Sequence, residues 1–317
     1  MCNRNEKPYN KDVLINEFNK NNNVIKEVEQ KLGAGNSLKD FYDHYLETHR
    51  DNLVNLESEL LNNVFLKMKD ECSIHSIRSR VKNPYHLLDK LIRKIKTNTG
   101  YSGINIDNYH LYFDDLLGFR LLLLYNENWS PVHDYILYHF GYDKNGFVDK
   151  NKRTQLDRSK TMIISMPEAN IRNGDEESLY LPKVQEGELK IKRGRYYRSV
   201  HYSVFYKGYC FEIQVRSLFD EAWGEIDHDI LYPLFLDNKD LIDYSKLINR
   251  ISGIANEMSS YFKYTIIRNT PPSGTPTLHS VPDELTLSKQ NDNRSQNILN
   301  TNGSGNPHDA INKILGE

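Results

Sequence analysis

The sequence predicts an α+β fold, and three features of its hydrophobic pattern support that prediction. Apolar residues recur at three- and four-residue spacings through most of the first 70 residues, which is the period of an amphipathic helix. From Cys72 onward, stretches that alternate between polar and apolar residues indicate half-buried strands. The short apolar run Leu116–Tyr125 indicates a buried strand. Helical patterns between and after these strands complete an α+β arrangement.

Composition excludes several classes of protein. The chain has 317 residues, with 41 Lys and Arg against 43 Asp and Glu, and a formal net charge of −2. This balance argues against a protein whose main partner is a long polyanion, because that function favours a strongly basic surface. The longest apolar run contains Arg120 and is much shorter than the about 20 residues of a membrane helix. We therefore expect no membrane partner, and the polar N-terminal segment predicts no secretory signal.

The cysteines indicate the compartment. Cys2, Cys72 and Cys210 lie far apart, and no two of them form a C-x-x-C pair. A sparse and odd set in a chain of this length is typical of reduced thiols in a cytosolic protein. We expect a cytoplasmic protein without disulfides or a zinc site.

Two helical stretches precede the first strand. Residues 11–31 have helical spacing, although the Asn run at 21–23 weakens the pattern. Ser37 can cap a longer helix, whose apolar stripe runs from Leu38 to Phe65. We expect residues 1–71 to form a helical N-terminal extension, which is too short for another enzymatic domain of ordinary size.

Residues 72–235 are expected to form the main domain. Alternation over 74–82 indicates its first strand, and Pro84 then opens a helix that reaches about Ile95, because the fixed φ of proline suits a first turn. The elements expected after this helix are the strand Leu116–Tyr125, the helix Pro131–Phe140, the strand Thr161–Met166, a hairpin of Arg198–Tyr206 with Cys210–Val215, and the helix Leu218–Leu231.

The C-terminal part divides in two. A helix over 241–264 is expected within the segment 236–268. Beyond Thr270 the chain is rich in Pro, Ser, Thr, Asn and Gly, a composition that buries too little apolar surface to fold. The sequence therefore predicts a disordered tail over 269–317, with one short helical pattern at Asp309–Leu315.

Six cations lie on the first strand and the helix after it: Arg78, Arg80, Lys82, Lys90, Arg93 and Lys94. The first three share one side of the strand, and the other three share one side of the helix. A run of charge most often covers only a solvated surface. Two cationic sides on neighbouring elements also suit a triphosphate, which Arg binds through paired hydrogen bonds and Lys as a point charge.

Carboxylates and aromatic residues flank the buried strands. Asp114 and Asp115 precede the strand at 116–125, where a carboxylate can bind Mg²⁺, although a pair of Asp residues is also common in turns. Tyr197 follows a basic stretch and offers a stacking surface for a purine, although aromatic residues in strands more often belong to the core. Glu212 alternates with apolar residues in the next strand. Polar side chains within a buried sheet are costly, which favours a functional site there.

Five motifs in order resemble the RelA/SpoT alarmone synthetase domain. They are R-x-K (Arg80, Lys82), D-L-L-G-x-R (Asp115 to Arg120), Y-R-S-V-H (Tyr197 to His201), E-I-Q-V-R (Glu212 to Arg216) and the stretch from Ala222 to Pro233. The resemblance covers about residues 72–235. Each motif alone is weak, but five in order at compatible spacing form a specific signal.

The resemblance implies a nucleotidyltransferase-like mixed β-sheet flanked by helices, and a single-domain synthetase. It implies transfer of pyrophosphate from ATP to the ribose 3′-OH of GDP or GTP, with Mg²⁺ as cofactor. The residues that it assigns to ATP are Arg78, Arg80, Lys82 and Lys90. It assigns metal binding and catalysis to Asp115 and Glu212. The acceptor nucleotide would contact Tyr197, Arg198, His201 and Gln214. Lys192 and Arg195 are candidates for its phosphates, but which cation of 190–195 binds them stays open.

The sequence also departs from the family pattern. His86 stands where many members have Ser, Tyr196 replaces the Gly before the Y-R-S motif, and the P-K-x-N-G stretch is absent. These changes leave the acceptor open. A second hypothesis is a toxic relative that pyrophosphorylates the 3′-CCA end of tRNA, and a third is a nucleotide sensor without catalysis. The resemblance also allows for a homo-oligomer or an antitoxin partner.

Overall fold

The computed structural model describes residues 8–18, 20–32, 36–97, 101, 103–194, 197–231 and 238–269. The predicted tail beyond Thr270, with its short helical pattern at Asp309–Leu315, lies outside the described residues. So do Arg195 and Tyr196.

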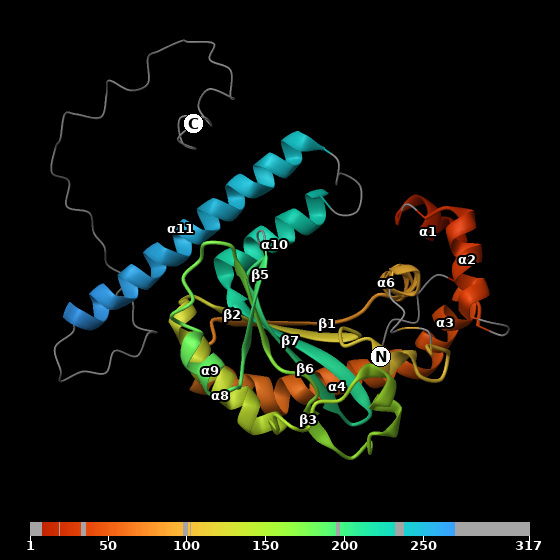
Figure 1. Cartoon of the computed structure of the whole chain (residues 1–317), viewed down its shortest axis with the longest axis horizontal. Coiled ribbons are helices and arrows are strands. Elements are labelled where there is room, and N and C mark those ends of the chain that lie inside the picture. The colour runs from red at the N-terminus through yellow and green to blue at the C-terminus, as the bar shows by residue number, and fades with distance from the viewer. Residues whose placement is uncertain are drawn as a thin grey trace, which may run out of the picture. The chain divides into compact units, whose positions relative to one another are not determined.

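A mixed sheet of seven strands forms the centre of the fold (Figure 1). Its strands are β1 (Ser76–Val81), β2 (Leu117–Leu123), β3 (Thr161–Ile163), β4 (Glu168–Arg172), β5 (Lys190–Gly194), β6 (Ser199–Tyr206) and β7 (Tyr209–Ser217). Their order is β1-β2-β7-β6-β4-β5, and β3 pairs with β6. β2 with β7 and β4 with β5 run parallel, whereas the other pairs are antiparallel. The predicted α+β class with a mixed sheet flanked by helices is confirmed.

Helices precede, interrupt and follow the sheet. They are α1 (Lys11–Asn16), α2 (Asn22–Leu32), α3 (Leu38–His44), α4 (Arg50–Leu60), α5 (Leu66–Glu71), α6 (Pro84–Thr97), α7 (Tyr109–Tyr112), α8 (Trp129–Phe140), α9 (Leu181–Gln185), α10 (Leu218–Leu231) and α11 (Lys239–Asn269). Two π-helical turns, η1 (Tyr45–His49) and η2 (Leu61–Phe65), join α3, α4 and α5 into one continuous helix. Short 3₁₀ turns, η4 (Asn126–Asn128) and η5 (Lys150–Gln155), flank α8.

Side-chain caps fix the starts of two N-terminal helices, α2 and α3. Ser37 caps α3 through a capping box, in which its side chain accepts from the backbone N–H of Asp40 and the Asp40 carboxylate accepts from the backbone N–H of Ser37. The expected helix over 11–31 is instead two helices, α1 and α2. The Asn run lies at the start of α2, where Asn21 accepts from the N–H of Val24. Asparagine favours such caps over helix interiors.

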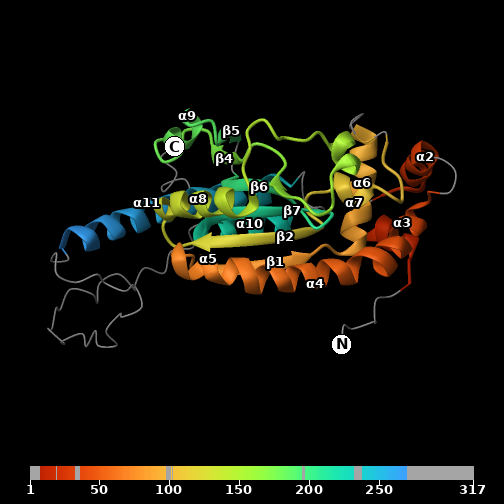
Figure 2. The same cartoon turned by 90° about the horizontal axis from the view of Figure 1, so that it is seen from below.

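One face of the central strands packs into an aromatic core. Phe119 of β2 and Phe211 of β7 have ring centroids 5.7 Å apart, and Phe65 of η2 lies 4.2 Å from Phe119. Phe140 of α8 completes the cluster, with its ring centroid 5.6 Å from that of Phe211 and 6.2 Å from that of Phe65. Figure 2 shows α4 lying along β1 and β2 on this side of the sheet. The core therefore fixes the side of β2 and β7 that is buried, and leaves their polar side chains on the opposite face.

The pattern failed to predict two strands. They are β4 and β5, which pair in parallel at the edge of the sheet. β5 reads Lys-Ile-Lys-Arg-Gly, and most of its side chains are exposed, so its sequence does not indicate a strand.

Among the residues that the structure describes, no helix combines the length and the apolar character needed to span a membrane.

Three buried histidines lie on helical elements that pack around the sheet, namely His49 of η1, His110 of α7 and His133 of α8. His49 and His110 are each 6% exposed, their rings lie 4.5 Å apart, and one nitrogen of each has no hydrogen-bond partner. His133 of α8 is fully buried against the Tyr202 hydroxyl, 2.9 Å from its Nδ1. Burial lowers the pKa of His49 to about 3, and the pKa values of His110 and His133 to about 4. All three are therefore neutral in the folded protein at pH 7.

We predict that the free energy of unfolding falls as the pH falls from about 6 to 5. In this window the unfolded histidines bind protons near their usual pKa of about 6.5 while the folded ones remain neutral, which costs about 1.4 kcal/mol per pH unit for each histidine. Urea unfolding at several pH values measures the slope. His110→Leu should flatten it by about one histidine's share, and the exposed His75→Gln should not. An unchanged slope in His110→Leu would contradict the prediction.

Candidate functional site

A row of polar side chains crosses the sheet from edge to edge. Cross-strand pairing aligns six residues, one from each strand of the main path, on one face: Arg78, Arg120, Gln214, His201, Glu168 and Lys190. A parallel row contains Arg80, Gly118, Glu212 and Ser203. The alternation of side chains along each strand places both rows opposite the aromatic core. The motifs predicted to carry the chemistry therefore meet on one face.

Asp115 lies between two ammonium groups. Its Oδ2 is 2.6 Å from the Nζ of Lys82, and its Oδ1 is 2.6 Å from the Nζ of Lys90. Burial alone would raise the pKa of Asp115, but the two lysines outweigh it and hold that pKa well below its usual value. Asp115 is therefore ionised at every pH of biological interest.

Asp114 has a different environment from its neighbour. It forms an ion pair with the buried Arg153 of η5 and accepts a hydrogen bond from Ser203 Oγ at 3.2 Å. Arg153 also donates to the carbonyl oxygen of Leu111 at 3.0 Å. Asp114 thus connects η5 to the sheet, whereas Asp115 faces Lys82, which directly follows β1, and Lys90 of α6. The adjacent pair divides into a structural carboxylate and a carboxylate of the site.

Glu212 is oriented by two direct neighbours, one of which is itself positioned by a tyrosine. His201 Nδ1 lies 2.7 Å from Glu212 Oε1, and Gln214 Nε2 donates to Oε2 at 2.9 Å. The other His201 nitrogen lies 3.0 Å from the Tyr197 hydroxyl. A carboxylate only accepts hydrogen bonds, so His201 carries a proton on Nδ1. Burial raises the pKa of Glu212, but the contact with His201 more than offsets this, so that pKa lies below its usual value.

Asp115 and Glu212 open onto one small pocket of about 130 Å³. Arg78, Arg80, Arg120 and Gln214 also line it. Gly118 forms part of its floor, and a Cβ at Gly118 would meet no atom within 4 Å. The missing side chain therefore keeps the space between Arg80 and Glu212 open.

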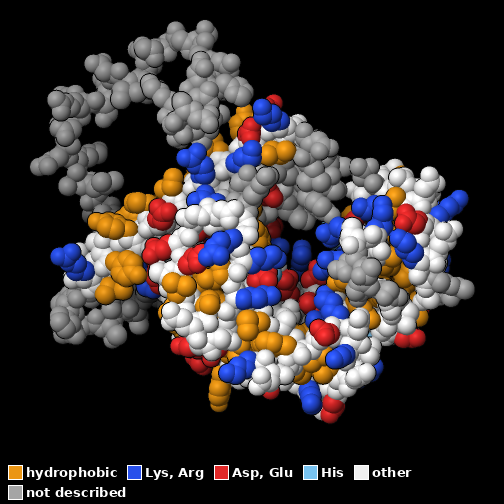
Figure 3. Space-filling view, viewed as in Figure 1, with side chains coloured by type: hydrophobic (Ala, Val, Ile, Leu, Met, Phe, Trp, Pro, Cys, Tyr) orange, Lys and Arg blue, Asp and Glu red, His pale blue; other side chains and the backbone are white. Residues whose placement is uncertain are grey.

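A second pocket of about 500 Å³ adjoins the first, and Arg80 and Asp115 line both. Its other polar walls come from α6 and the residues before it, namely Lys82, Asn83, His86, Asp89 and Arg93. In Figure 3, Lys and Arg side chains gather with acidic ones around the hollow in the middle of the view. The two pockets together place arginines and lysines around Asp115, which lines both of them.

Helix α10 supplies carboxylates to the same face. Glu221, 3% exposed, lies 2.9 Å from Arg120, 2.8 Å from Arg216 and 3.3 Å from Arg78. Glu225 forms a further ion pair with Arg120. Three arginines from three strands thus share one buried carboxylate, which fixes their directions. Glu221 could not be predicted from the sequence, because helical spacing alone does not show which strand a helix covers.

The predicted acceptor residues are more scattered. Tyr197 lies 5.8 Å from the guanidinium of Arg216, beside His201. Arg198 instead pairs with Asp175 at 2.6 Å and with Asp220 at 3.4 Å, and it does not line either of the two pockets. Lys192 is exposed and lies 3.1 Å from Glu168. The predicted roles of these three residues stay predictions, and Arg195 lies outside the described residues.

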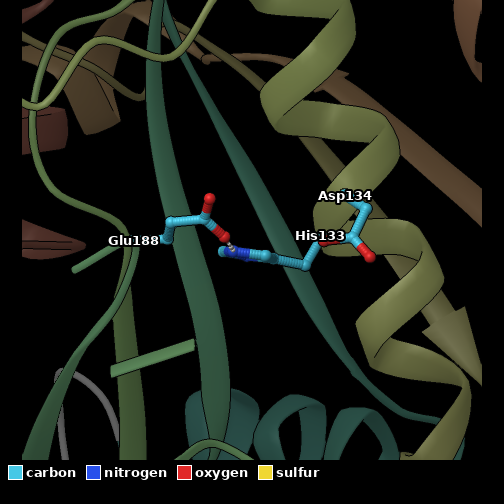
Figure 4. A group of neighbouring side chains, drawn as sticks. All are labelled: His133, Asp134 and Glu188. Carbon is cyan, nitrogen blue, oxygen red and sulfur yellow. Dashed lines mark ion pairs between the residues drawn. The ribbon is translucent and has the colours of Figure 1, made fainter. Parts of the chain in front are cut away.

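A separate group of metal-ligand types lies against α8. His133, Asp134 and Glu188 form the one such cluster among the described residues, and Figure 4 shows the His133 ring directed at the Glu188 carboxylate. The ammonium group of Lys183 lies 2.7 Å from Asp134 and 3.2 Å from Glu188. Lys183 therefore already balances these carboxylates, and the cluster includes neither carboxylate of the pocket.

Comparison with known families identifies the segment that carries the site. Residues 79–234 match the family model described as "Region found in RelA / SpoT proteins". This part of the chain belongs to the RelA/SpoT family. The predicted resemblance is thereby confirmed, and Arg80, Lys82, Asp115 and Glu212 all lie within the RelA/SpoT segment. None of the curated proteins compared with the chain matches it.

Solved structures of similar proteins include two from Bacillus subtilis. Small alarmone synthetase 1 is 17% identical, with 72% of this chain and 99% of that chain covered and a TM-score of 0.46. Small alarmone synthetase 2 is 19% identical, with 68% and 97% covered and a TM-score of 0.41. A GTP pyrophosphokinase family protein from Streptococcus pneumoniae is 17% identical, with 73% and 94% covered and a TM-score of 0.43.

The shared carboxylate of the RelA/SpoT segment predicts a large effect on stability. We expect Glu221→Gln to lower the free energy of unfolding by about 3 kcal/mol, because removing one partner of a buried ion network leaves the other charges uncompensated. Glu225→Gln is the matched control, since Glu225 is 45% exposed and should cost less than about 1 kcal/mol. Denaturant titration measures both variants. Equal losses would contradict the central position of Glu221.

Proposed function

We propose that the protein is an ATP-dependent diphosphotransferase that transfers pyrophosphate to the ribose 3′-OH of GDP or GTP, as a single-domain synthetase of (p)ppGpp. The observation that carries this proposal is the ionised Asp115 between Lys82 and Lys90, in a pocket that also contains Glu212. The RelA/SpoT segment includes all four residues.

The donor side of the reaction needs charge neutralisation and alignment. In our proposal Arg80, Lys82 and Lys90, together with Arg78, hold the phosphates of ATP in the two pockets. Arg80 lines both pockets and makes no ion pair with any residue that the structure describes, so its guanidinium is available to a phosphate. Transfer of phosphoryl groups depends mainly on such positioning and electrostatic stabilisation.

Asp115 and Glu212 suit the divalent ion that the proposal includes. Both carboxylates have lowered pKa values and remain ionised, and carboxylate oxygens are the protein ligands that Mg²⁺ prefers. When bound there, Mg²⁺ would neutralise charge on the phosphate oxygens. Lys82 and Lys90 would exchange their contacts with Asp115 for contacts with the phosphates, so that no charge is left without a partner.

On the acceptor side, Glu212 is the proposed base. The contacts from His201 and Gln214 fix the directions of its oxygens, one of which takes the proton of the attacking 3′-hydroxyl. The hydroxyl oxygen then bonds to the β-phosphorus of ATP, the bond between that phosphorus and the α,β-bridging oxygen breaks, and AMP leaves. Tyr197, beside His201, would stack on the acceptor base.

The cations of β5 favour a nucleotide over a polynucleotide as acceptor. Lys190 and Lys192 both contact Glu168, at 3.0 and 3.1 Å, and Arg193 contacts Glu177. Cations that already have carboxylate partners on the surface attract a long polyanion less strongly. The observation supports GDP or GTP rather than the 3′-CCA end of tRNA.

The proposal predicts label transfer from ATP to a guanine nucleotide. Full-length protein incubated with γ-labelled ATP and Mg²⁺ should label GDP or GTP, but not deacylated tRNA. Asp115→Asn and Glu212→Gln should each slow the transfer by at least about 100-fold, the lower range for a positioned base. Asp107→Asn, an exposed carboxylate outside the pocket, is the control. Label on tRNA alone would overturn the proposed acceptor, and nucleotide binding without transfer to any acceptor would overturn catalysis.

A larger side chain at Gly118 should weaken the binding of ATP in the pocket. We predict that Gly118→Val folds normally, because a Cβ at Gly118 meets no atom within 4 Å and β-branched residues suit strands. Its side chain would enter the pocket of about 130 Å³ and should weaken the binding of a non-hydrolysable ATP analogue by at least about tenfold, or 1.4 kcal/mol. Calorimetry measures the binding, and Gly118→Ala should have a smaller effect. Wild-type affinity in Gly118→Val would contradict the assigned pocket.

A further inference from the structure

The buried Arg216 closes a ring of contacts around Glu212. Its Nη2 donates to Gln214 Oε1 at 3.1 Å, and Gln214 Nε2 donates to Glu212 Oε2 at 2.9 Å. Its guanidinium also lies over the ring of Tyr197, 5.8 Å from the ring centroid. The Tyr197 hydroxyl contacts His201, whose Nδ1 lies 2.7 Å from Glu212 Oε1. Two chains of contacts, one to each oxygen of Glu212, therefore both begin at Arg216.

We propose that Arg216 is a positioning residue of the transfer reaction: it fixes the direction of the proposed base, Glu212, through these two chains. The inference rests on the proposed function, because it takes Glu212 as the base. Arg216 is only 7% exposed and lines neither of the two pockets assigned to ATP. Its effect on the reaction therefore passes through its neighbours.

The amide of Gln214 has one orientation that satisfies both of its neighbours. A guanidinium only donates hydrogen bonds and a carboxylate only accepts them, whereas an amide has one end of each kind. An amide rotated by 180° would present its oxygen to the carboxylate of Glu212 and its NH₂ group to the N–H groups of Arg216. Both contacts would then be repulsive. Arg216 thus selects the orientation in which Gln214 donates to Glu212.

Helix α10 holds Arg216 in place from two positions. Glu221 Oε2 lies 2.8 Å from Arg216 Nε, and both side chains are almost fully buried. Gly224, three residues later on the same side of the helix, leaves the space that the guanidinium fills. A Cβ at Gly224 would lie 2.9 Å from Arg216 Nη1, closer than the roughly 3.5 Å at which such atoms make favourable contact. A methyl group at this position must therefore displace the guanidinium.

Gly224 is otherwise unfavourable where it stands. It lies in the interior of α10 (Leu218–Leu231), where its backbone is helical and where alanine would favour the helix more than glycine does. The close approach of Arg216 supplies the reason for a glycine at this position. The substitution that favours the helix is thus the one that should disturb the orientation of Glu212.

Gly224→Ala tests the proposal while keeping every charge. We expect the variant to fold and to slow the transfer of label from ATP to GDP or GTP at least about tenfold, because small displacements of a catalytic group are costly. Binding of a non-hydrolysable ATP analogue, measured by calorimetry, should not change. Gly146→Ala is the matched control. Its Cβ would also crowd a side chain, that of Asp143 at 3.2 Å, but in the loop after α8, and transfer should be unchanged.

Arg216→Lys tests the same contact from the other side. Lysine keeps a positive charge beside Glu221 but lacks the fork that reaches Gln214 and Tyr197, so transfer should again slow at least about tenfold. Lysine also has no Nη1 for a methyl group to displace. Adding Gly224→Ala to Arg216→Lys should therefore slow transfer by less than about twofold more, whereas two independent defects would multiply.

The outcomes separate this inference from the proposed function. If the wild type labels GDP or GTP and Glu212→Gln is slow, but Gly224→Ala transfers at the wild-type rate, positioning through Arg216 is overturned and the proposed function stands. The same conclusion follows if binding of the ATP analogue weakens as much as transfer slows, or if the effects of the two substitutions multiply. A wild type that transfers no label overturns the proposed function and this inference with it.

Discussion

The division of β2 and β7 into an apolar face and a charged face is the constraint on which the rest of the structure depends. Phe119 and Phe211 require one face to be covered, and α8 with the long N-terminal helix covers it. The strict alternation of a strand then forces Arg120, Glu212 and their neighbours onto the other face. A slip of one residue in the pairing of either strand would bury these charges in the aromatic core, so the core fixes the register of the site.

Charges placed on that face need partners, and the helices supply them. α10 contributes Glu221 to three arginines, and α6 contributes Lys90 to Asp115. Removing one charge from such a buried network costs more than removing a surface ion pair, because the remaining charges lose their compensation. The predicted contrast between Glu221→Gln and Glu225→Gln rests on this difference. The same networks hold the guanidinium and ammonium groups in fixed directions, which is what the recognition of a polyphosphate requires.

Much of this site could be predicted from the sequence, because its residues follow the period of a strand. The alternation that brings Arg78 and Arg80 to one side also aligns them with Arg120, and the alternation in β7 aligns Glu212 with Gln214. Partners from elsewhere in the chain could not be found in this way. A single sequence does not show that Glu221 contacts the arginines or that Arg198 pairs with Asp175. Nor does it show that Asp114 pairs with Arg153 while its neighbour Asp115 pairs with the lysines. Each of these depends on how elements pack, and the exposed, Lys-rich β5 has no pattern that marks it as a strand.

The two adjacent acidic residues at the start of α10 connect the site to α11. Asp220 accepts hydrogen bonds from Ser252 and Asn256 of α11, while Glu221 faces the arginines of the sheet. Trp223, one turn further along α10, donates to the backbone carbonyl of Ser245. Because α10 makes both sets of contacts within a single turn, the position of α11 and the direction of the carboxylate that holds the arginines depend on the same part of α10.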